Sequence, residues 1–559
     1  MTRTLRDHIA AAIRTPRGAG LAALFLILLM VLPGQTTIPP IDRDEPRFAQ
    51  ATRQMLETGD FVDIRFLDQP RHLQPAGIYW FQAAAVSLVG DADVRAIWPH
   101  RVPSWLAAVA TVFLTWWAGG LLFGRDAGRI AATLMGACLI VGVEARLAKI
   151  DSMLCATTLL AQASLARAFI ARERAEALNV WWVIAFWAAL GVGGLLKGPI
   201  VLLVTGGTVL GLIALERRAR WLGALKPLWG APLMLAIAAP WYVAIGFATD
   251  GAFYRTAVGY SVVGKVAGSH QNHGGPIGYH ALLFSAVFWP GSLFAWLAVP
   301  FAWAQRRAPA VRFCLAWIIP AWIVFEFSGT KLPHYTLPLL PAVAMLCAAA
   351  ILDAGAQRWF GRPRLFLAAA VVWLLLAGLF LAGAPALRLE LQQDQGVGPL
   401  LLGGVGLLGA GLTLALIAQG RARAGVVAMA ATALVAWTNL FAFTLPAMDK
   451  LFLSPRVVAA LADERRCPLT RLALLDYHEP SLVFLYGPGV VLTRTPEEAA
   501  TAVAADPACT LALTASPGRA GFLEAMAAQG MAVREIAAIS GENYNEADEG
   551  ALTIYRATR

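Results

Sequence analysis

An acidic segment near the N-terminus holds the side chains best suited to chemistry. Asp42, Asp44 and Glu45 place three carboxylates within four residues, just after an apolar run. Such a group could take a proton from a hydroxyl, orient a sugar hydroxyl or bind a divalent metal. A helix N-cap with solvated acids is the alternative, because Asp44 precedes Pro46. The segment is therefore a candidate catalytic site, with capping as the competing interpretation.

Single charged residues mark the ends of later apolar runs. Lys149 and Asp151 open one run, and Lys197 joins two others. A carboxylate at the mouth of a span is costly unless it faces protein or water, although Asp151 could also cap a helix. Lys197 could neutralise a lipid phosphate, or its side chain could simply extend to the headgroups. We expect both residues to lie at a membrane surface.

A short turn rich in Gly and Pro gathers Ser328, Lys331, His334 and Tyr335 between two apolar runs. Lysine supplies a point charge, and the Ser or Tyr hydroxyl supplies a hydrogen-bond donor. The turn could therefore form a phosphate pocket. Interfacial Lys and Tyr anchors are the common alternative.

Three histidines, His270, His273 and His280, surround a Gly-Gly-Pro segment. Histidine often binds divalent metals, but separations of three and seven residues are not diagnostic of a metal site. His270 and His273 are therefore only weak candidates for metal ligands. The sequence leaves open whether the protein uses a divalent metal as a cofactor.

The composition indicates what must position these groups. Of 559 residues, 58% are hydrophobic and only 14% are charged, whereas a soluble domain carries about 25% charged residues. Because about 20 apolar residues span a bilayer, we predict a polytopic membrane protein. The thirteen candidate spans are 19–34, 97–122, 128–144, 149–170, 180–195, 199–215, 229–247, 279–303, 310–327, 335–353, 364–386, 398–418 and 424–445. Residues 76–90 are apolar but short, and we expect an interfacial helix there.

The connectors between the apolar runs predict the orientation. The N-terminal segment and six alternate connectors are all basic, whereas the other set carries fewer basic residues. Basic segments stay in the cytoplasm, so we expect the N-terminus inside, and the loop 35–96 and the C-terminus outside a bacterial inner membrane. No small-residue cleavage site follows the first run, which we expect to be retained. Orientation accounts for the net charge of +10, and no nucleic-acid motif is present.

The composition changes after Pro446, and residues 447–559 predict a small periplasmic α/β domain. We expect strands over 471–476, 482–486 and 550–556, and helices over 496–505 and 519–529. Cys467 and Cys509 could form a disulfide in an oxidising compartment, or remain two buried thiols. The predicted fold class is an all-α polytopic membrane domain, residues 1–446 with about 13 transmembrane helices, followed by this small domain.

The placement of the polar residues limits the function classes. The sequence has no Walker loop, which argues against a self-contained ATP-driven pump. A flippase or transporter of lipid-linked sugars would need polar residues through the bilayer centre and inverted repeats, and neither is visible. A one-sided outer site needs an activated donor, and a lipid-linked phosphate sugar is a donor that reaches that compartment. A glycosyltransferase is therefore favoured, with a transporter or a non-catalytic scaffold as alternatives.

At these residues the chain resembles the aminoarabinose lipid A transferases and the wider group that includes protein O-mannosyltransferases. These are multi-span glycosyltransferases of the C fold. The resemblance covers about residues 20–445 and continues more faintly into the tail. Seven motifs carry it: Asp42 to Ala49, Gly77 to Gln82, Lys149 to Asp151, Leu196 to Pro199, Pro240 to Tyr242, His273 to Pro276 and Ser328 to Tyr335.

The resemblance implies a sugar donor on undecaprenyl or a similar polyprenyl phosphate. The sugar would pass to an outer-leaflet acceptor, such as lipid A, another envelope glycan or a protein, usually with inversion at the anomeric carbon. The catalytic acid of the family falls on Asp44, with Glu45 and Asp42 as neighbours. A carboxylate there could take the proton of the acceptor.

Other family positions imply residues that bind substrate or phosphate. Asp151 matches a second acidic position, and Lys197 and Lys331 match basic positions that could stabilise a departing phosphate. The further binding candidates are His334, Tyr335 and Arg71.

One segment departs from the family pattern. Relatives carry a Lys before the Pro that precedes the Tyr-Trp pair, and the aminoarabinose enzymes carry a Glu before that Lys. In this chain Gln74 replaces the Lys and Leu73 replaces the Glu. Arg71 or His72 could supply the charge from a different position. The departure puts the lipid A phosphate chemistry, and any metal bound there, in doubt.

Overall fold

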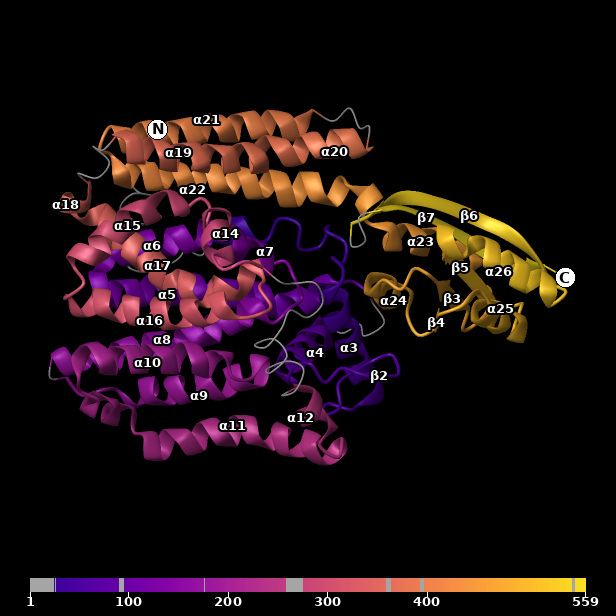
Figure 1. The fold of residues 1–559 in the computed structure, drawn as a ribbon, viewed down its shortest axis with the longest axis horizontal. Helices are drawn as coiled ribbons and strands as arrows, with labels where there is room; N and C mark the ends of the chain where they lie inside the picture. Colours follow the sequence, from indigo (N-terminus) through magenta and orange to yellow (C-terminus); the bar gives the residue numbers. More distant parts are fainter. Residues whose placement is uncertain are drawn as a thin grey trace, which may run out of the picture.

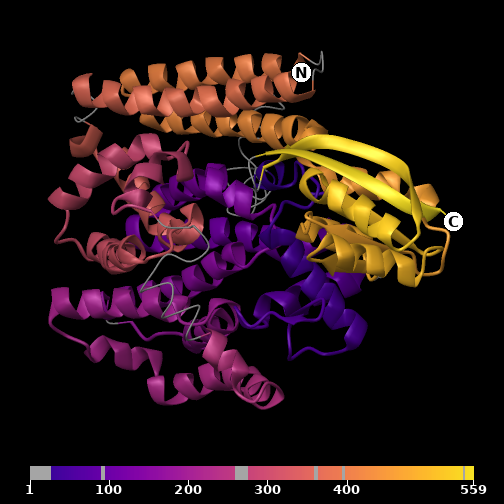
Figure 2. The same ribbon diagram turned by 45° about the vertical axis from the view of Figure 1, so that its right-hand side comes forward.

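The structure is a computed structural model that describes residues 25–558 apart from 26, 90–94, 175, 258–274, 358–362, 393–396 and 545–547. A bundle of helices carries a small sheet domain at one end (Figures 1 and 2). Within the described part, nine helical segments are long and apolar enough to cross a membrane. The polytopic all-α prediction is confirmed. The nine segments are α5 (Trp98–Phe123), α8 (Asp151–Glu173), α9 (Val180–Lys197), α11 (Pro227–Ala248), α16 (Pro309–Phe327), η3 with α17 (Pro333–Leu352), α19 to α20 (Arg364–Leu391), α21 (Gly398–Ala418) and α22 to η7 (Ala422–Ala447).

Several predicted spans are shorter or interrupted. The run 128–144 divides into α6 (Arg125–Ala137) and α7 (Leu139–Glu144), because Cys138 is extended, with ψ of 130°. The run 279–303 divides into α14 (Tyr279–Val287) and α15 (Ser292–Ala304). The span 199–215 corresponds to α10 (Ile200–Glu216), which has 17 residues. Within the span 19–34, residues 19–24 and 26 lie outside the described residues. Further short helices are η1 (Arg220–Leu225), α12 (Ala252–Thr256), α18 (Ala354–Gln357), η8 (Asp449–Leu451) and η9 (Ala462–Glu464).

The loop 35–96, here called the acidic loop, is folded. It contains α3 (Asp44–Thr58), a hairpin of β1 (Arg65–Phe66) and β2 (Gln69–Pro70), and α4 (Gly77–Val89), which is the predicted short apolar helix. Phe48 and Met55 on α3 are buried with Ile78 and Tyr79 of α4. The helix α3 ends at Gly59, whose φ of 71° favours glycine. Packing of α3 against α4 therefore fixes the helix that begins at Asp44.

The C-terminal domain is a five-stranded sheet in the order β4-β3-β5-β7-β6. The strand β3 pairs in parallel with β4 and β5, and β7 pairs antiparallel with β5 and β6. The strands are β3 (Arg471–Leu475), β4 (Val490–Thr493), β5 (Thr510–Ala515), β6 (Ala532–Asn543) and β7 (Asp548–Thr558). The helices are α23 (Leu453–Ala460), α24 (Pro480–Tyr486), α25 (Pro496–Ala505) and α26 (Ser516–Ala528). The small α/β fold is as predicted.

The predicted strand at 482–486 was wrong, because this segment lies in α24. Pro480 stands in the first turn, where its fixed φ favours a helix. The short apolar run that follows is buried, and pattern alone does not separate a buried strand from a buried helix. The other predicted elements of this domain are present, whereas β4, β5 and β6 were not predicted.

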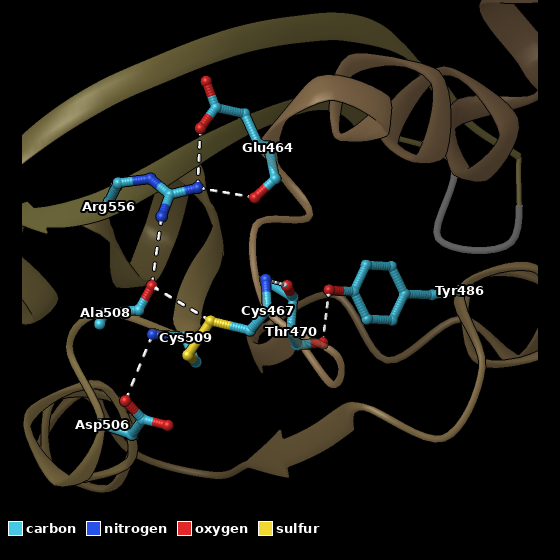
Figure 3. The surroundings of a disulfide bond; sticks show 8 residues. All are labelled: Glu464, Cys467, Thr470, Tyr486, Asp506, Ala508, Cys509 and Arg556. Carbon is cyan, nitrogen blue, oxygen red and sulfur yellow. Dashed lines mark hydrogen bonds and ion pairs between the residues drawn. A yellow bond between two sulfur atoms is a disulfide. The ribbon is translucent and has the colours of Figure 1, made fainter.

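A disulfide joins Cys467, ahead of β3, to Cys509, ahead of β5, with their Cα atoms 5.7 Å apart (Figure 3). Arg556 on β7 donates to the carbonyl oxygens of Ala508 at 3.3 Å and of Glu464 at 2.7 Å. These contacts tie the segment before β3 to the middle of the sheet. Of the two alternatives for this cysteine pair, the structure has the disulfide.

Candidate active site

Two helix ends meet at an ion pair between Asp151 and Lys197. Asp151 is the first residue of α8 and Lys197 is the last residue of α9, and Lys197 Nζ lies 2.6 Å from Asp151 Oδ1. His334 in η3 (Pro333–Leu339) places Nε2 3.5 Å from the other carboxylate oxygen of Asp151. Three predicted binding residues, from three separate motifs, therefore share one cluster.

Glu144 and Lys149 complete this cluster, although the sequence analysis did not place either among the site residues. Glu144 ends α7, and its Oε1 lies 3.3 Å from Lys149 Nζ and 3.6 Å from His334 Nδ1. Burial acts to lower the pKa of Lys149, but the charges of Glu144 and Asp151 raise it above its ordinary value. Lys149 is thus held as a cation. A lone acid at the end of the apolar run 128–144 was the signal that could have identified Glu144.

A cavity of about 740 Å³ lies beside the cluster. Asp151, Lys197, His334 and Tyr335 are at its polar end, and Lys197 Nζ lies 5.2 Å from the centre of the Tyr335 ring, within reach of a cation–π contact. The walls are largely apolar, and include Leu154, Ile200, Leu203, Phe253, Ile323 and Phe327. The cavity can hold a ligand that combines an anionic end with a hydrocarbon chain.

The segment that departs from the family pattern also lies on this cavity. Leu73 and Gln74 both line it, and the buried Gln74 Oε1 has no hydrogen-bond partner within the described residues. Arg71 is not among the lining residues. Its Nε donates to the Tyr79 hydroxyl at 2.9 Å, and its guanidinium lies 4.7 Å from the centre of the Phe48 ring. Arg71 thus does not put its charge in the place of the missing Lys.

Glu45 is fully buried and paired with Arg101. Its two carboxylate oxygens lie 2.7 and 2.9 Å from the guanidinium nitrogens of Arg101. The same oxygens accept hydrogen bonds from the backbone N–H groups of Ala148 and Ile41, each at 2.9 Å. A carboxylate with this many partners fixes the acidic loop against α5 and against the segment that carries Lys149.

Asp44 is exposed at the first turn of α3. Its charge contributes, after those of Glu144 and Asp151, to the raised pKa of Lys149. It also opposes the lowering of the Arg47 pKa, which burial and the nearby Arg71 cause. Asp44 therefore stands near the charged cluster with its carboxylate accessible, whereas the neighbouring Asp42 contacts the C-terminal domain.

Of the remaining predicted residues, Lys331 makes its hydrogen bond outside the cluster. Lys331 is buried and donates from Nζ to the carbonyl oxygen of Gly275 at 2.8 Å. Gly278 N–H donates to Oε1 of Glu326, near the end of α16, at 2.8 Å. Glu326 and Lys331, which lie on either side of Ser328, therefore both hold the chain at 275–278. His270 and His273 lie outside the described residues.

Glu144, Asp151 and His334 could each offer one ligand atom to a divalent metal, and these atoms lie within 4.8 Å of one another. The buried Glu144 Oε2 has no hydrogen-bond partner in the described part of the chain. A metal here would supply positive charge next to a phosphate. The same carboxylates already contact Lys149 and Lys197, so the ion would share them with two cations.

The chain is similar to several known glycosyltransferases. Residues 73–243 match the model of the dolichyl-phosphate-mannose-protein mannosyltransferase family. The undecaprenyl phosphate-alpha-4-amino-4-deoxy-L-arabinose arabinosyl transferase of Yersinia pestis is 26% identical over 345 residues, which is 60% of this chain and 59% of that relative. The corresponding transferase of Aeromonas hydrophila is 27% identical over 403 residues, which is 69% of this chain and 70% of the relative. The match thus spans about three fifths of the length of the Yersinia relative.

Solved structures show the same fold. ArnT from Cupriavidus metallidurans bound to undecaprenyl phosphate superposes with a TM-score of 0.73 at 18% identity, over 96% of this chain and 98% of that one. Its apo form gives a TM-score of 0.70 at 18% identity, over 96% of each chain. The resemblance predicted from the seven motifs is confirmed, and it extends through the C-terminal domain.

Proposed function

We propose that this chain is a glycosyltransferase that takes a sugar from a polyprenyl-phosphate carrier. It passes the sugar to lipid A or another envelope glycan at the periplasmic face of the bacterial inner membrane. The names of the similar transferases include undecaprenyl phosphate, and the similar ArnT structure has that lipid bound. Lysine cations beside an apolar cavity suit such a carrier, because its phosphate is anionic and its chain is hydrocarbon.

The observation that carries the proposal is the junction of the cavity with the cluster of Asp151, Lys197 and His334. Lys197 stands at the polar end, where it can neutralise the carrier phosphate as that group departs. Asp151 holds the lysine in place through the 2.6 Å ion pair. The apolar walls beyond it would take the first isoprene units of the carrier.

We assign the proton transfer to Asp44. The acceptor hydroxyl attacks the anomeric carbon, the bond from that carbon to the carrier phosphate breaks, and Asp44 takes the hydroxyl proton. The phosphate leaves on the lipid, beside Lys197. Because Glu45 is fully buried against Arg101, its role is to hold the loop that carries Asp44.

The domain arrangement supports a site on one face. The acidic loop, α12 and the C-terminal domain gather at the same end of the bundle (Figure 1). We propose that residues 1–446 form the transmembrane glycosyltransferase domain, that residues 447–559 form a periplasmic domain, and that the N-terminus is cytoplasmic. Asp44 and the cluster of Asp151, Lys197 and His334 would then face substrates from the outer leaflet.

The proposal is tested with cells that carry the wild-type protein, no protein, or one of two variants. Asp44→Asn removes the candidate base, and Asp68→Asn is its control, because Asp68 is an exposed carboxylate in the same loop. Mass spectrometry of the extracted lipid A and other glycolipids should show one species that loses a single sugar in the deletion and in Asp44→Asn cells. Asp68→Asn cells should match the wild type.

A transfer assay with purified protein, a polyprenyl-phosphate sugar and the acceptor lipid from the deletion cells, which lacks the sugar, completes the test. Asp44→Asn should lower the rate about 100-fold or more, the range of general base catalysis. If the Asp44→Asn protein transferred sugar at the wild-type rate, Asp44 would not be the base. If no glycolipid changes on deletion and no transfer occurs, the glycosyltransferase assignment fails.

A further inference from the structure

Asp42, two residues before the candidate base, is bound by the C-terminal domain. Ser481 in α24 donates its backbone N–H to Asp42 Oδ1 at 2.8 Å and its hydroxyl to Asp42 Oδ2. Both carboxylate oxygens are therefore used on one serine, 439 residues away in the sequence. This contact joins the acidic loop to the start of α24.

A line of buried hydroxyls supports that serine. Ser481 Oγ lies 2.6 Å from Ser454 Oγ, which lies 3.0 Å from the Tyr477 hydroxyl. When Asp42 is ionised it only accepts hydrogen bonds, so Ser481 must donate to it, and Ser454 and Tyr477 can each donate to the next. The hydroxyl of Ser481 is thereby oriented toward Asp42 by groups that lie wholly within the C-terminal domain.

A second segment of the C-terminal domain also contacts Asp42. The backbone N–H of Asp42 donates to the hydroxyl of Tyr544, just after β6, at 2.8 Å. The next residue, Arg43, has its Nε 3.8 Å from Glu479 Oε1. Asp42 is therefore held on its side chain and on its backbone. We call Asp42, Ser481 and Tyr544 the clasp.

Apolar packing fixes the domain beside the clasp. Phe484 in α24 is fully buried and packs with Ala49 of α3, Ile97 and Ala148. Its ring lies 5.3 Å from that of His100, edge to face. The domain thus reaches the acidic loop through a buried apolar contact, and the clasp binds the same loop two residues before Asp44.

We propose that Ser481 and Tyr544 are positioning residues that hold the start of α3, so that Asp44 stays directed at the acceptor. The expected effect on catalysis rests on the proposed function. The holding of the start of α3 rests only on the contacts of Asp42. The C-terminal domain would then belong to the active site without touching the substrate.

The test compares Ser481→Ala and Tyr544→Phe with two control variants in full-length protein in lipid nanodiscs. Ser516→Ala and Tyr486→Phe are the controls, because each removes one hydroxyl whose hydrogen bond stays within the C-terminal domain. Hydrogen exchange of residues 40–50 should become about tenfold faster in the clasp variants, as expected for the loss of a bond to a charged or backbone group. The controls should exchange like the wild type.

The transfer assay gives the second readout. The clasp variants should lower kcat about tenfold and leave KM for the lipid-linked sugar unchanged, because the cavity is intact. Unchanged exchange at 40–50, or faster exchange with unchanged kcat, would overturn the inference. Faster exchange in a protein whose wild type transfers no sugar would overturn the proposed function instead, and would leave the clasp standing as a structural contact.

Discussion

Asp151 is a buried carboxylate and Asp42 is a half-buried one, and the two are paired in opposite ways, the first with charged groups and the second with neutral ones. Asp151 has Lys197 at 2.6 Å, His334 at 3.5 Å and Lys149 at 4.0 Å. Asp42 is bound by the amide and hydroxyl of Ser481. Burial raises the pKa of Asp42 to about 7, and the charge of Glu479 adds to the rise.

From this difference in partners we infer different roles: the cluster around Asp151 takes part in the chemistry, and the clasp around Asp42 positions the acidic loop. In the cluster, charge is balanced by opposite charge, so a phosphate can exchange partners with the lysines at low cost. In the clasp, neutral donors hold a single acid at the boundary between two parts of the chain. We infer that the first region binds an anion and that the second holds two elements together.

The largest effect should come from breaking the charge balance of the cluster with Asp151→Asn. Lys197 would lose its 2.6 Å partner, whereas Lys149 would keep its pair with Glu144. We expect transfer to fall about 100-fold or more, because the cation next to the departing phosphate is no longer held. The purified protein should also lose about 3 kcal/mol of stability, measured by thermal unfolding.

The double variant Asp151→Asn with Lys197→Met sharpens this result. It removes both charges of the pair, so stability should recover while activity does not. Recovery of activity in the double variant would show that the ion pair serves only the fold.

Glu45→Gln tests the carboxylate of the acidic segment that is paired with a buried arginine, Arg101. Glu45 and Arg101 have no exposed side-chain surface, so the variant leaves a buried guanidinium without its partner. We expect a loss of about 3–5 kcal/mol in the free energy of unfolding. Glu57→Gln in the same helix is the control, because the Glu57 carboxylate is 45% exposed in its pair with the buried Arg53, and solvent screening should limit that pair to about 1 kcal/mol. Similar losses in both variants would contradict the holding role.

Removing the disulfide with Cys467→Ser and Cys509→Ser should destabilise the C-terminal domain, which carries two of the three clasp residues, and leave the cluster around Asp151 unchanged. The bridge closes a loop with a sequence separation of 42, for which chain entropy predicts about 2–4 kcal/mol. Hydrogen exchange in β3 and β5 should rise, whereas exchange at the start of α8 should not. A reductant should reproduce the effect in the wild type and have none on the double variant.

Three of the predicted binding residues lie together in the structure, for a physical reason. Asp151, Lys197 and His334 are isolated charged or polar groups at the ends of apolar runs, and span alternation puts such ends on one face. Glu144 follows the same logic but was missed, because it closes a run that the structure divides at Cys138. The number of spans could be predicted less well, since interruptions within a run depend on packing.

The partners of the acidic segment could not be predicted from local pattern. Arg101 lies 56 residues from Glu45, and Ser481 lies 439 residues from Asp42. Which of three neighbouring acids stays exposed depends on these distant contacts. The same limit explains α24, where burial against α3 gave a helix an apolar pattern that is typical of a strand.

The last prediction is a pH dependence that the variant Asp42→Asn isolates. Its pKa is raised from an ordinary value of 3.8 to about 7, so folding favours the protonated acid. The stabilising contribution is therefore complete below about pH 4 and is lost as the pH rises toward about 7. Asn mimics the protonated acid at every pH, so the wild type should lose stability relative to Asp42→Asn across this range. Thermal unfolding at several pH values measures the difference, and Asp68→Asn, an exposed site, should show no such trend. A difference that is flat with pH would mean that Asp42 stays charged in the clasp, as Asp151 can beside its lysines, and the contrast between the two regions would disappear.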